Sequence, residues 1–159
     1  MRMSRGYVLQ ADGMVRRFAQ DKEMTDTKDY GALLLRISLA LLFFAHAGLK
    51  IFVFTPAGTA QFFGSLGLPP ALAYLVILAE VVGGLALLFG VYARYVALAL
   101  VPVLLGAIAT VHGANGFWFT AQGGGWEYPA FWTVALLVQF LIGDGAYALR
   151  ASPRAVAIA

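Results

Sequence analysis

Residues 30–54 read YGALLLRISLALLFFAHAGLKIFVF, and this run of 25 residues decides the fold class. Its only basic side chains are Arg36, His46 and Lys50, and it has no acidic residue. At about 1.5 Å rise per residue, a helix of this length measures about 37 Å, more than the roughly 30 Å hydrocarbon core of a bilayer. We therefore predict that this segment crosses a membrane.

The composition of the whole chain also indicates a membrane protein. Hydrophobic residues make up 61% of the 159 residues and charged residues 12%, whereas globular proteins have about 45–50% and about 25%. A soluble domain of this size leaves too much surface exposed to hide so many apolar side chains. We predict the lipid bilayer as the main partner, and we do not interpret the net charge of +3 as a sign of nucleic-acid binding.

Three further apolar segments follow the first one. The predicted spans are 71–91, 95–111 and 128–147, with long loops at 55–69 and 113–127. The expected fold is all-α, a polytopic membrane protein with a bundle of four transmembrane helices.

The distribution of basic residues predicts the orientation. Nine of the eleven Lys and Arg residues lie in the two terminal segments and in the tight turn at 92–94, while the two long loops carry none. By the positive-inside rule, both termini are expected to be cytoplasmic. The chain then divides into a polar tail at 1–29, a membrane domain at 30–147 and a basic tail at 148–159. We expect the first segment to be a mobile tail or a short surface helix, unless Met24 is the natural start.

Several kinds of cofactor site are excluded or not expected. The chain has no cysteine, so it can form no disulfide, thiol redox centre, iron–sulfur site or cysteine-based zinc site by itself. No metal site is predicted. His46 and His112 are the only imidazoles, and because their predicted depths differ, a haem between them is not expected. The polar first thirty residues do not resemble a cleavable signal peptide.

Ionisable residues within the predicted spans are candidates for function, because each costs about 2.5–3.5 kcal/mol to insert. Counting from the helix ends, Glu80 lies about 15 Å and His46 about 12 Å below the outer surface. Lys50 lies one turn nearer that surface on the face of His46. We predict that these three residues share a pocket with His112 just above it, and all four are candidate catalytic residues.

Each of these residues also has a structural alternative. Glu80 could form an ion pair with Lys50 or Arg36 that only fixes the helix register. Lys50 could instead extend to the outer headgroups. His46 could hydrogen-bond a neighbouring helix, and His112 could be an ordinary residue at a helix end.

Arg36 lies nearer the cytoplasmic side, in the same sector of its helix as Lys50. Gln139 and Asp144 of the fourth span are its expected partners, with a long reach to Glu80 as an alternative. Arg36 is a candidate substrate-binding residue, or a topological anchor.

The second long loop contributes further candidates. Residues 123–129 read GGGWEYP, a flexible backbone followed by an acid flanked by rings. This stretch is either an interfacial anchor or a lid that brings Glu127 over the mouth of the bundle. Asn115, Trp126, Glu127 and Tyr128 are candidate substrate-binding residues, because aromatic rings with hydrogen-bonding groups suit a flat ligand such as a quinone head.

Four stretches together, LLLRISLALLFFAHAGLKIF, AEVVGGLALLFG, VHGANGF and GGGWEYP, resemble the DoxX family of bacterial membrane proteins. The likeness covers about residues 30–147 and leaves out residues 1–23. The residues that carry it are Arg36, His46, Gly48, Lys50, Glu80, Gly83, Gly84, His112, Asn115, Gly116, Phe117, Trp126, Glu127, Tyr128 and Pro129. The resemblance implies a four-helix fold in the bacterial inner membrane. It also implies association with oxidoreductase complexes of the thiosulfate:quinone oxidoreductase or terminal-oxidase kind.

The leading hypothesis is a membrane subunit of a redox complex whose polar cluster meets a quinone or a sulfur compound. His46 or His112 would exchange protons, Lys50 would stabilise an anion, and Glu80 would hold the cation or relay a proton. Electrons would come from a cofactor or a partner subunit. Two alternatives remain open: a non-catalytic scaffold or assembly subunit, and a small-solute or proton transporter.

Overall fold

A computed structural model describes residues 5–153 of the chain, with side chains described for residues 27–153. The described part is all-helical, apart from a single bridge between Val91 and Arg150. Its elements, in chain order, are α1 (Arg5–Gly48), η1 (Leu49–Val53), α2 (Pro56–Ser65), α3 (Ala71–Phe89), α4 (Ala93–Ala107), η2 (Ile108–His112), η3 (Gly113–Asn115) and α5 (Glu127–Ile142).

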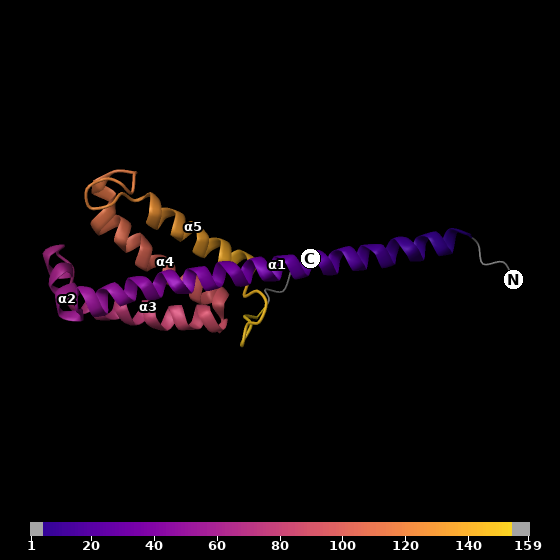
Figure 1. Cartoon of the computed structure of the whole chain (residues 1–159), viewed down its shortest axis with the longest axis horizontal. Helices are drawn as coiled ribbons and strands as arrows, with labels where there is room; N and C mark the ends of the chain where they lie inside the picture. Colours follow the sequence, from indigo (N-terminus) through magenta and orange to yellow (C-terminus); the bar gives the residue numbers. More distant parts are fainter. Residues whose placement is uncertain (1–4, 154–159) are drawn as a thin grey trace.

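The helices form two pairs. Figure 1 shows α1 running along α3, while α4 runs beside α5. The two pairs lie close together near the chain's C-terminal segment and diverge toward the end where α2 is found (Figure 1). This divergence positions the site described below.

Three helical segments are long and apolar enough to cross a membrane: Thr27–Val53, Ala71–Phe89 and Ala93–Asn115. Helix α5 is apolar but has only 16 residues, which corresponds to about 24 Å. Large apolar side chains, including Leu34, Phe52 and Leu141, are exposed on the outward faces, as expected for surfaces that meet lipid.

Helix α1 begins much earlier than the sequence predicted. Residues 5–29, expected as a mobile tail or a short surface helix, continue the first span without a break and project beyond the bundle in Figure 1. The first proline of the chain is Pro56, so no proline interrupts the helical ladder before that point. Residues 1–4 lie outside the described part.

The predicted loop at 55–69 contains helix α2. Its first residue is Pro56, and the Thr55 hydroxyl accepts a hydrogen bond from the Gly58 backbone N–H at 3.1 Å. Proline suits the first turn of a helix and threonine suits its cap. Pro56 therefore starts a helix here, where the sequence analysis took it as the boundary of a loop.

The ends of two other helices also differ from the prediction. Helix α4 starts at Ala93, so Arg94 lies in its first turn and not in a tight turn before it. Helix α5 ends at Ile142, where Gly143 has a φ of +96°, a conformation that favours glycine. Asp144 therefore follows the helix and does not lie in its last turns.

The predicted C-terminal tail packs against the turn between α3 and α4 as far as the structure describes it. The Tyr92 N–H donates to the Arg150 carbonyl at 2.8 Å, and the Leu149 N–H donates to the Phe89 carbonyl at 3.0 Å. This segment closes the end of the bundle opposite α2.

The core joins all four long helices. Its buried residues are Leu39, Ala40, Phe43, Leu87, Ala93, Ala97, Leu100, Leu104, Trp132 and Leu136. Two glycines of α3 allow close approach, since a Cβ at Gly83 would lie 2.8 Å from Leu100 and one at Gly84 would lie 2.8 Å from the Phe44 ring. Small residues at such contacts are typical of helices that pack within membranes.

Candidate functional site

A cavity of about 730 Å³ lies where the two helix pairs diverge. Its walls come from the end of α1 with η1, from α2, from the first half of α3, from α4 with η2, and from the start of α5. Its lining is mostly apolar. The side chains of all four predicted catalytic residues line it, namely His46, Lys50, Glu80 and His112.

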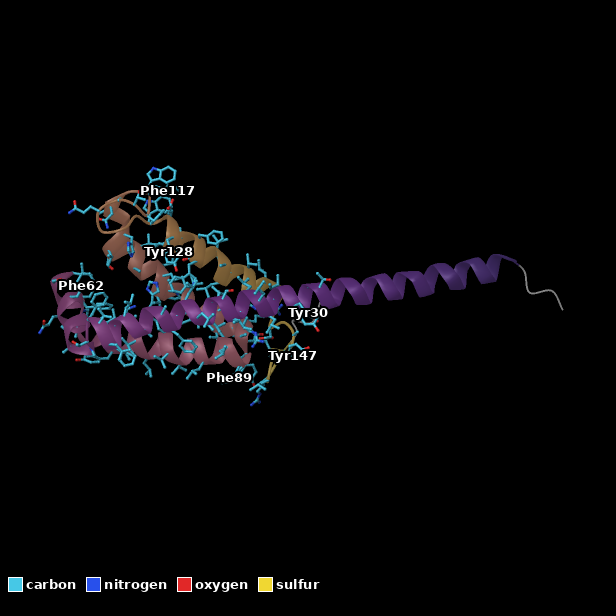
Figure 2. All side chains as sticks on the ribbon, in the orientation of Figure 1. Tyr30, Phe62, Phe89, Phe117, Tyr128 and Tyr147 are labelled. Carbon is cyan, nitrogen blue, oxygen red and sulfur yellow. The ribbon has the colours of Figure 1, made fainter. Side chains whose placement is uncertain are left out.

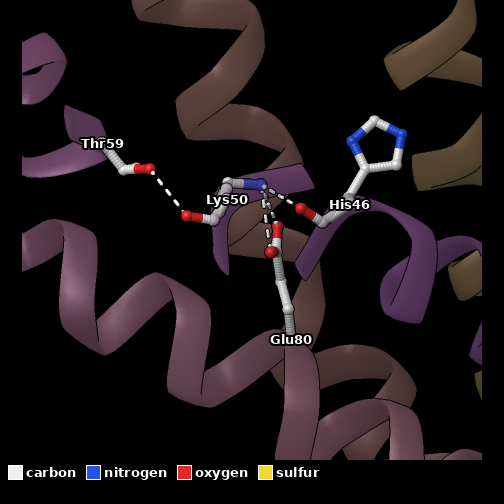
Figure 3. A network of polar contacts seen from close by, with 4 residues as sticks. All are labelled: His46, Lys50, Thr59 and Glu80. Atoms are coloured by element: carbon white, nitrogen blue, oxygen red, sulfur yellow. Dashed lines mark hydrogen bonds and ion pairs between the residues drawn. The ribbon is translucent and has the colours of Figure 1, made fainter. Parts of the chain in front are cut away.

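Lys50 and Glu80 form an ion pair in the wall of this cavity. The Lys50 Nζ lies 2.8 Å from Glu80 Oε1 and 3.0 Å from Oε2, and it also donates to the His46 carbonyl at 3.5 Å (Figure 3). The exposed fractions of the two side chains are 19% for Lys50 and 4% for Glu80. Lys50 and Arg36 were the predicted partners of Glu80, and Lys50 is the one that pairs with it. The Lys50 ammonium donates to both Glu80 oxygens and to the His46 carbonyl.

Helix α2 is hydrogen-bonded to the backbone that carries Lys50. The Thr59 hydroxyl lies 3.3 Å from the Lys50 carbonyl oxygen and 2.9 Å from that of Thr55 (Figure 3). Thr59 was not predicted as a site residue, because residues 55–69 were expected to form a loop. A helix starting at Pro56 would have placed Thr59 one turn after Thr55, where such hydroxyl-to-carbonyl bonds form.

Two π-helical turns carry cavity residues. η1 ends the first long helix and contains Lys50, and η2 follows α4 and ends at His112. In η1, the Phe54 N–H donates to the Leu49 carbonyl five residues earlier, whereas an α-helical bond joins residues four apart. Isolated π turns occur frequently at functional sites, and nothing in the sequence pattern predicted these two.

The His46 ring packs among aromatic rings of α5. Its centroid lies 6.3 Å from that of Tyr128, with the planes nearly parallel, and 5.0 Å from that of Trp132. Within residues 27–153, its ring nitrogens form no hydrogen bond. The contact of His46 with a neighbouring helix is therefore aromatic, not the hydrogen bond that was considered, and both nitrogens remain available to a ligand.

Trp132 is a site residue that the sequence analysis missed. It lines the cavity and is 3% exposed. The centroid of its ring lies 4.7 Å from that of Phe43, and the ring also packs against His46. Its Nε1 has no hydrogen-bond partner in the described part of the chain. Helical spacing could have revealed it, because it lies four residues after Tyr128 and so on the same face.

His112 is held by the loop at 113–127. Its Nδ1 lies 2.9 Å from the Gly124 carbonyl oxygen. Because a carbonyl can only accept, Nδ1 carries the hydrogen, and Nε2 of the neutral ring is an acceptor. Asn115 donates to the same carbonyl at 3.0 Å and to that of Val111 at 3.1 Å. Asn115 does not line the cavity, and it fixes the loop around His112.

The other candidates in this loop divide into two groups. Tyr128 lines the cavity, whereas Trp126 and Glu127 do not. The Glu127 carboxylate accepts from the Phe119 N–H at 3.1 Å, and Trp126 packs edge-on against Phe117. Glu127 therefore stabilises the loop in this structure and does not lie over the cavity as the predicted lid would require.

Arg36 lies away from the cavity, at the opposite end of α3. It is 1% exposed, and its guanidinium donates to the carbonyls of Leu87 at 3.1 Å, Leu88 at 3.2 Å and Ala146 at 3.0 Å. A cation at the C-terminal end of a helix is favoured by the helix dipole and can bond the last carbonyls of the helix. Arg36 thus joins α1 to the end of α3 and to the C-terminal segment.

The expected partners of Arg36 have other partners. The Gln139 amide donates to the Gly143 carbonyl at 2.7 Å. Asp144 accepts from the backbone N–H of Arg94 at 3.0 Å and from the N–H and hydroxyl of Ser152 at 2.7 and 2.9 Å. Among the described residues, Arg36 forms no direct hydrogen bond with either side chain, and its guanidinium bonds backbone carbonyls instead.

Residues 31–113, slightly more than half of the chain, match the model of the DoxX family. The chain belongs to the DoxX family. Over 88 residues it is 42% identical to a Bacillus subtilis (strain 168) protein named "Putative oxidoreductase CatD", covering 55% of this chain and 64% of that protein. Over 75 residues it is 41% identical to the inner membrane protein YqjF of Escherichia coli (strain K12), covering 47% and 56%.

The chain thus spans less than two thirds of either relative's length. No solved structure matches it significantly. Its membership of the DoxX family, its inner-membrane relative and its apolar helices make it a multi-pass inner-membrane protein. The family match includes all four candidate catalytic residues, from His46 to His112, and ends before α5 begins.

The cavity of this DoxX protein combines few polar groups with large apolar and aromatic surfaces. It offers the unbonded ring of His46, the Nε2 of His112 and the phenol of Tyr128, while its one lysine is paired with Glu80. Residues 27–153 contain no cluster of three or more metal-binding side chains. Such a lining is suited to an uncharged, flat molecule with a few hydrogen-bonding atoms.

Proposed function

We propose that this DoxX protein is the quinone-binding membrane subunit of a redox complex, with four spans and both termini on the cytoplasmic side. The observation that carries the proposal is the content of one largely apolar cavity. It holds two imidazoles and a lysine whose charge is neutralised by Glu80. The oxidoreductase name of the relative CatD agrees with this role.

The residues would divide the work as follows. His46 and His112 would hydrogen-bond the oxygens of the quinone head and exchange protons with them. Tyr128 and Trp132 would pack against its ring. A bound quinone would supply the capacity to take up electrons together with protons. Because the chain has no cysteine for iron–sulfur ligation, we assign the supply of electrons to a partner subunit.

A quinone is favoured over an anionic sulfur compound because of the state of Lys50. Its ammonium is bonded to both oxygens of Glu80, and no other lysine or arginine lines the cavity. An anion such as thiosulfate would have to break this pair, which would leave a nearly buried carboxylate without its partner. An uncharged quinone head makes no such demand.

Fluorescence of Trp132 provides a direct test. The double variant Trp118→Phe and Trp126→Phe removes the two loop tryptophans and leaves Trp132 as the only one. Titration of this protein in detergent with a tailless benzoquinone should quench Trp132 saturably. His46→Ala should weaken binding at least tenfold, about 1.4 kcal/mol, whereas Lys28→Ala, an exposed change outside the cavity, should have no effect.

Quenching that is identical in all variants would overturn the proposal, because it would report only partition of the quinone into the micelle. A saturable response to thiosulfate in place of quinone would favour a sulfur compound. Lower abundance of the His46 and Glu80 variants without any quinone binding would favour a scaffold.

A further inference from the structure

The cavity has a polar end and an apolar end. The histidines line it from the end of α1 and from η2, and the Lys50–Glu80 pair lines it from η1 and α3. The part of its wall formed by α2 and the loop that follows is almost entirely apolar, with Thr59 as the one polar side chain. The apolar residues there are Phe62, Phe63, Leu66 and Leu68, and Leu72 in the first turn of α3 continues them.

The cavity has an opening between α2 and α4, where lining residues of both helices are exposed. Helix α2 packs against α3 and η1. Figure 2 shows Phe62 on the α2 side of this opening and Tyr128 on the side of α5. On α4, Pro102 and Gly106 line the cavity and are also exposed, and Phe62 is 48% exposed.

The surface around this opening is apolar. Phe62 of α2 and Leu72 of α3, which line the cavity, and Leu105 of α4, next to Gly106, are large exposed hydrophobic residues, and both α3 and α4 belong to the segments able to cross a membrane. The hydrocarbon of a bilayer is the environment in which such surfaces are stable. The opening therefore faces lipid.

We propose that the ligand enters this cavity sideways from the bilayer between α2 and α4, and that the apolar end holds the first units of an isoprenoid tail. The inference rests on the proposed quinone function and specifies the ligand as a tailed, lipid-soluble quinone. The cavity volume of about 730 Å³ lies within the roughly 300–1,000 Å³ of sites that enclose drug-sized molecules. It is larger than the volume of a single quinone ring.

The charge of the lining favours a quinone tail over the acyl chain of a phospholipid. A phosphate headgroup requires cations or several N–H donors, and the only lysine in the lining is bonded to Glu80. A quinone head requires only the hydrogen-bonding groups that the polar end offers.

Gly106 provides a precise way to block the opening. It lines the cavity, and a Cβ built on it meets no atom within 4 Å, so a larger side chain there would occupy the opening without a clash. Gly31 on α1 has the same free space but does not line the cavity. Because both glycines are helical, Leu raises helix propensity at each, and the two variants form a matched pair.

The test compares two ligands in vesicles of phosphatidylcholine and phosphatidylglycerol. The protein with Trp132 as its only tryptophan is titrated with a tailless benzoquinone and with the same head carrying two isoprene units. Gly106→Leu should weaken binding of the tailed quinone at least tenfold and that of the tailless one less than twofold, while Gly31→Leu should change neither. A second variant, Phe62→Ser, makes the apolar end polar, leaves Gly106 intact and should act in the same direction.

The outcomes separate this inference from the proposed function. Equal effects of Gly106→Leu and Phe62→Ser on both quinones, or no effect on either, would overturn tail binding while His46-dependent binding of the tailless quinone still stood. Loss of tailless binding in the parent protein would overturn the proposed function itself. A copurified phospholipid that the tailed quinone fails to displace, detected by native mass spectrometry, would assign the apolar end to a lipid and would also overturn the inference.

Discussion

Lys50 Nζ lies 2.8 Å and 3.0 Å from the two carboxylate oxygens of Glu80, across the contact between η1 and α3. Both side chains are largely enclosed, so neither charge has much access to water. The pair joins two helices and leaves the cavity wall without a free lysine charge.

Removal of one member of this pair should destabilise the protein strongly. Glu80→Gln leaves the Lys50 ammonium without its counter-charge, and breaking an enclosed ion pair costs about 3–5 kcal/mol. We expect a clearly lower midpoint of thermal unfolding, measured by circular dichroism in detergent. The double variant Lys50→Met with Glu80→Gln should lose less stability than the sum of the single variants, and Lys28→Met serves as the exposed control. Strict additivity would show that the two charges do not interact.

Arg36 should matter for stability and not for ligand binding. Arg36→Met removes hydrogen bonds to the carbonyls of Leu87, Leu88 and Ala146, and bonds to charged groups contribute about 1.5–3 kcal/mol each. Arg36→Lys should not restore stability, since one ammonium lacks the planar fork that reaches carbonyls of two segments. Thermal unfolding should shift down while Trp132 quenching by quinone in the folded protein stays unchanged. A loss of quinone affinity at normal stability would place Arg36 in the binding site after all.

The close packing of α3 can be tested with alanine at two glycines. A Cβ at Gly84 would lie 2.8 Å from the Phe44 ring, and such overpacking costs about 1–3 kcal/mol. At Gly31 the same change meets open space and should stabilise the helix by up to about 1 kcal/mol. Unfolding midpoints should therefore move in opposite directions. A stabilised Gly84→Ala variant would show that α1 and α3 are less closely packed than described.

Two carboxylates should protect different ends of the bundle from exchange. Asp144 accepts from the N–H of Arg94 in the first turn of α4, and loss of such a cap costs about 1 kcal/mol. In hydrogen–deuterium exchange, Asp144→Ala should speed exchange at Arg94 and Ser152. Glu127→Ala is the matched control and should speed exchange at Phe119 only, because its bond lies within the loop at 113–127. Faster exchange at Phe119 in the Asp144 variant would contradict this separation.

Hydropathy and spacing predicted those features that depend on single long segments. The membrane location and the all-α class follow from runs such as residues 30–54, and helical geometry predicted that His46, Lys50 and Glu80 lie at a similar depth. The family follows from the resemblance of four sequence stretches. The four-span count and the cytoplasmic termini remain predictions, since α5 is shorter than the other spans.

Other features depend on partners that a sequence does not mark. The guanidinium of Arg36 bonds carbonyls, and because every residue has a carbonyl, no pattern singles these out. Helix α2 was missed because a segment rich in Gly and Phe between two prolines resembles a loop, although Pro56 suits a first helical turn. The π turns at Lys50 and His112 are local departures from α geometry that leave hydrophobic periodicity almost unchanged.

The length of α5 has a consequence for the membrane itself. With the four spans proposed above, a helix of 16 residues, about 24 Å long, must match a hydrocarbon layer of roughly 30 Å. Lipids beside α5 would compress their chains to cover it, whereas those beside the other spans would not. The protein would then sit in an unevenly thinned patch, and bilayers made from shorter-chain lipids would favour its insertion.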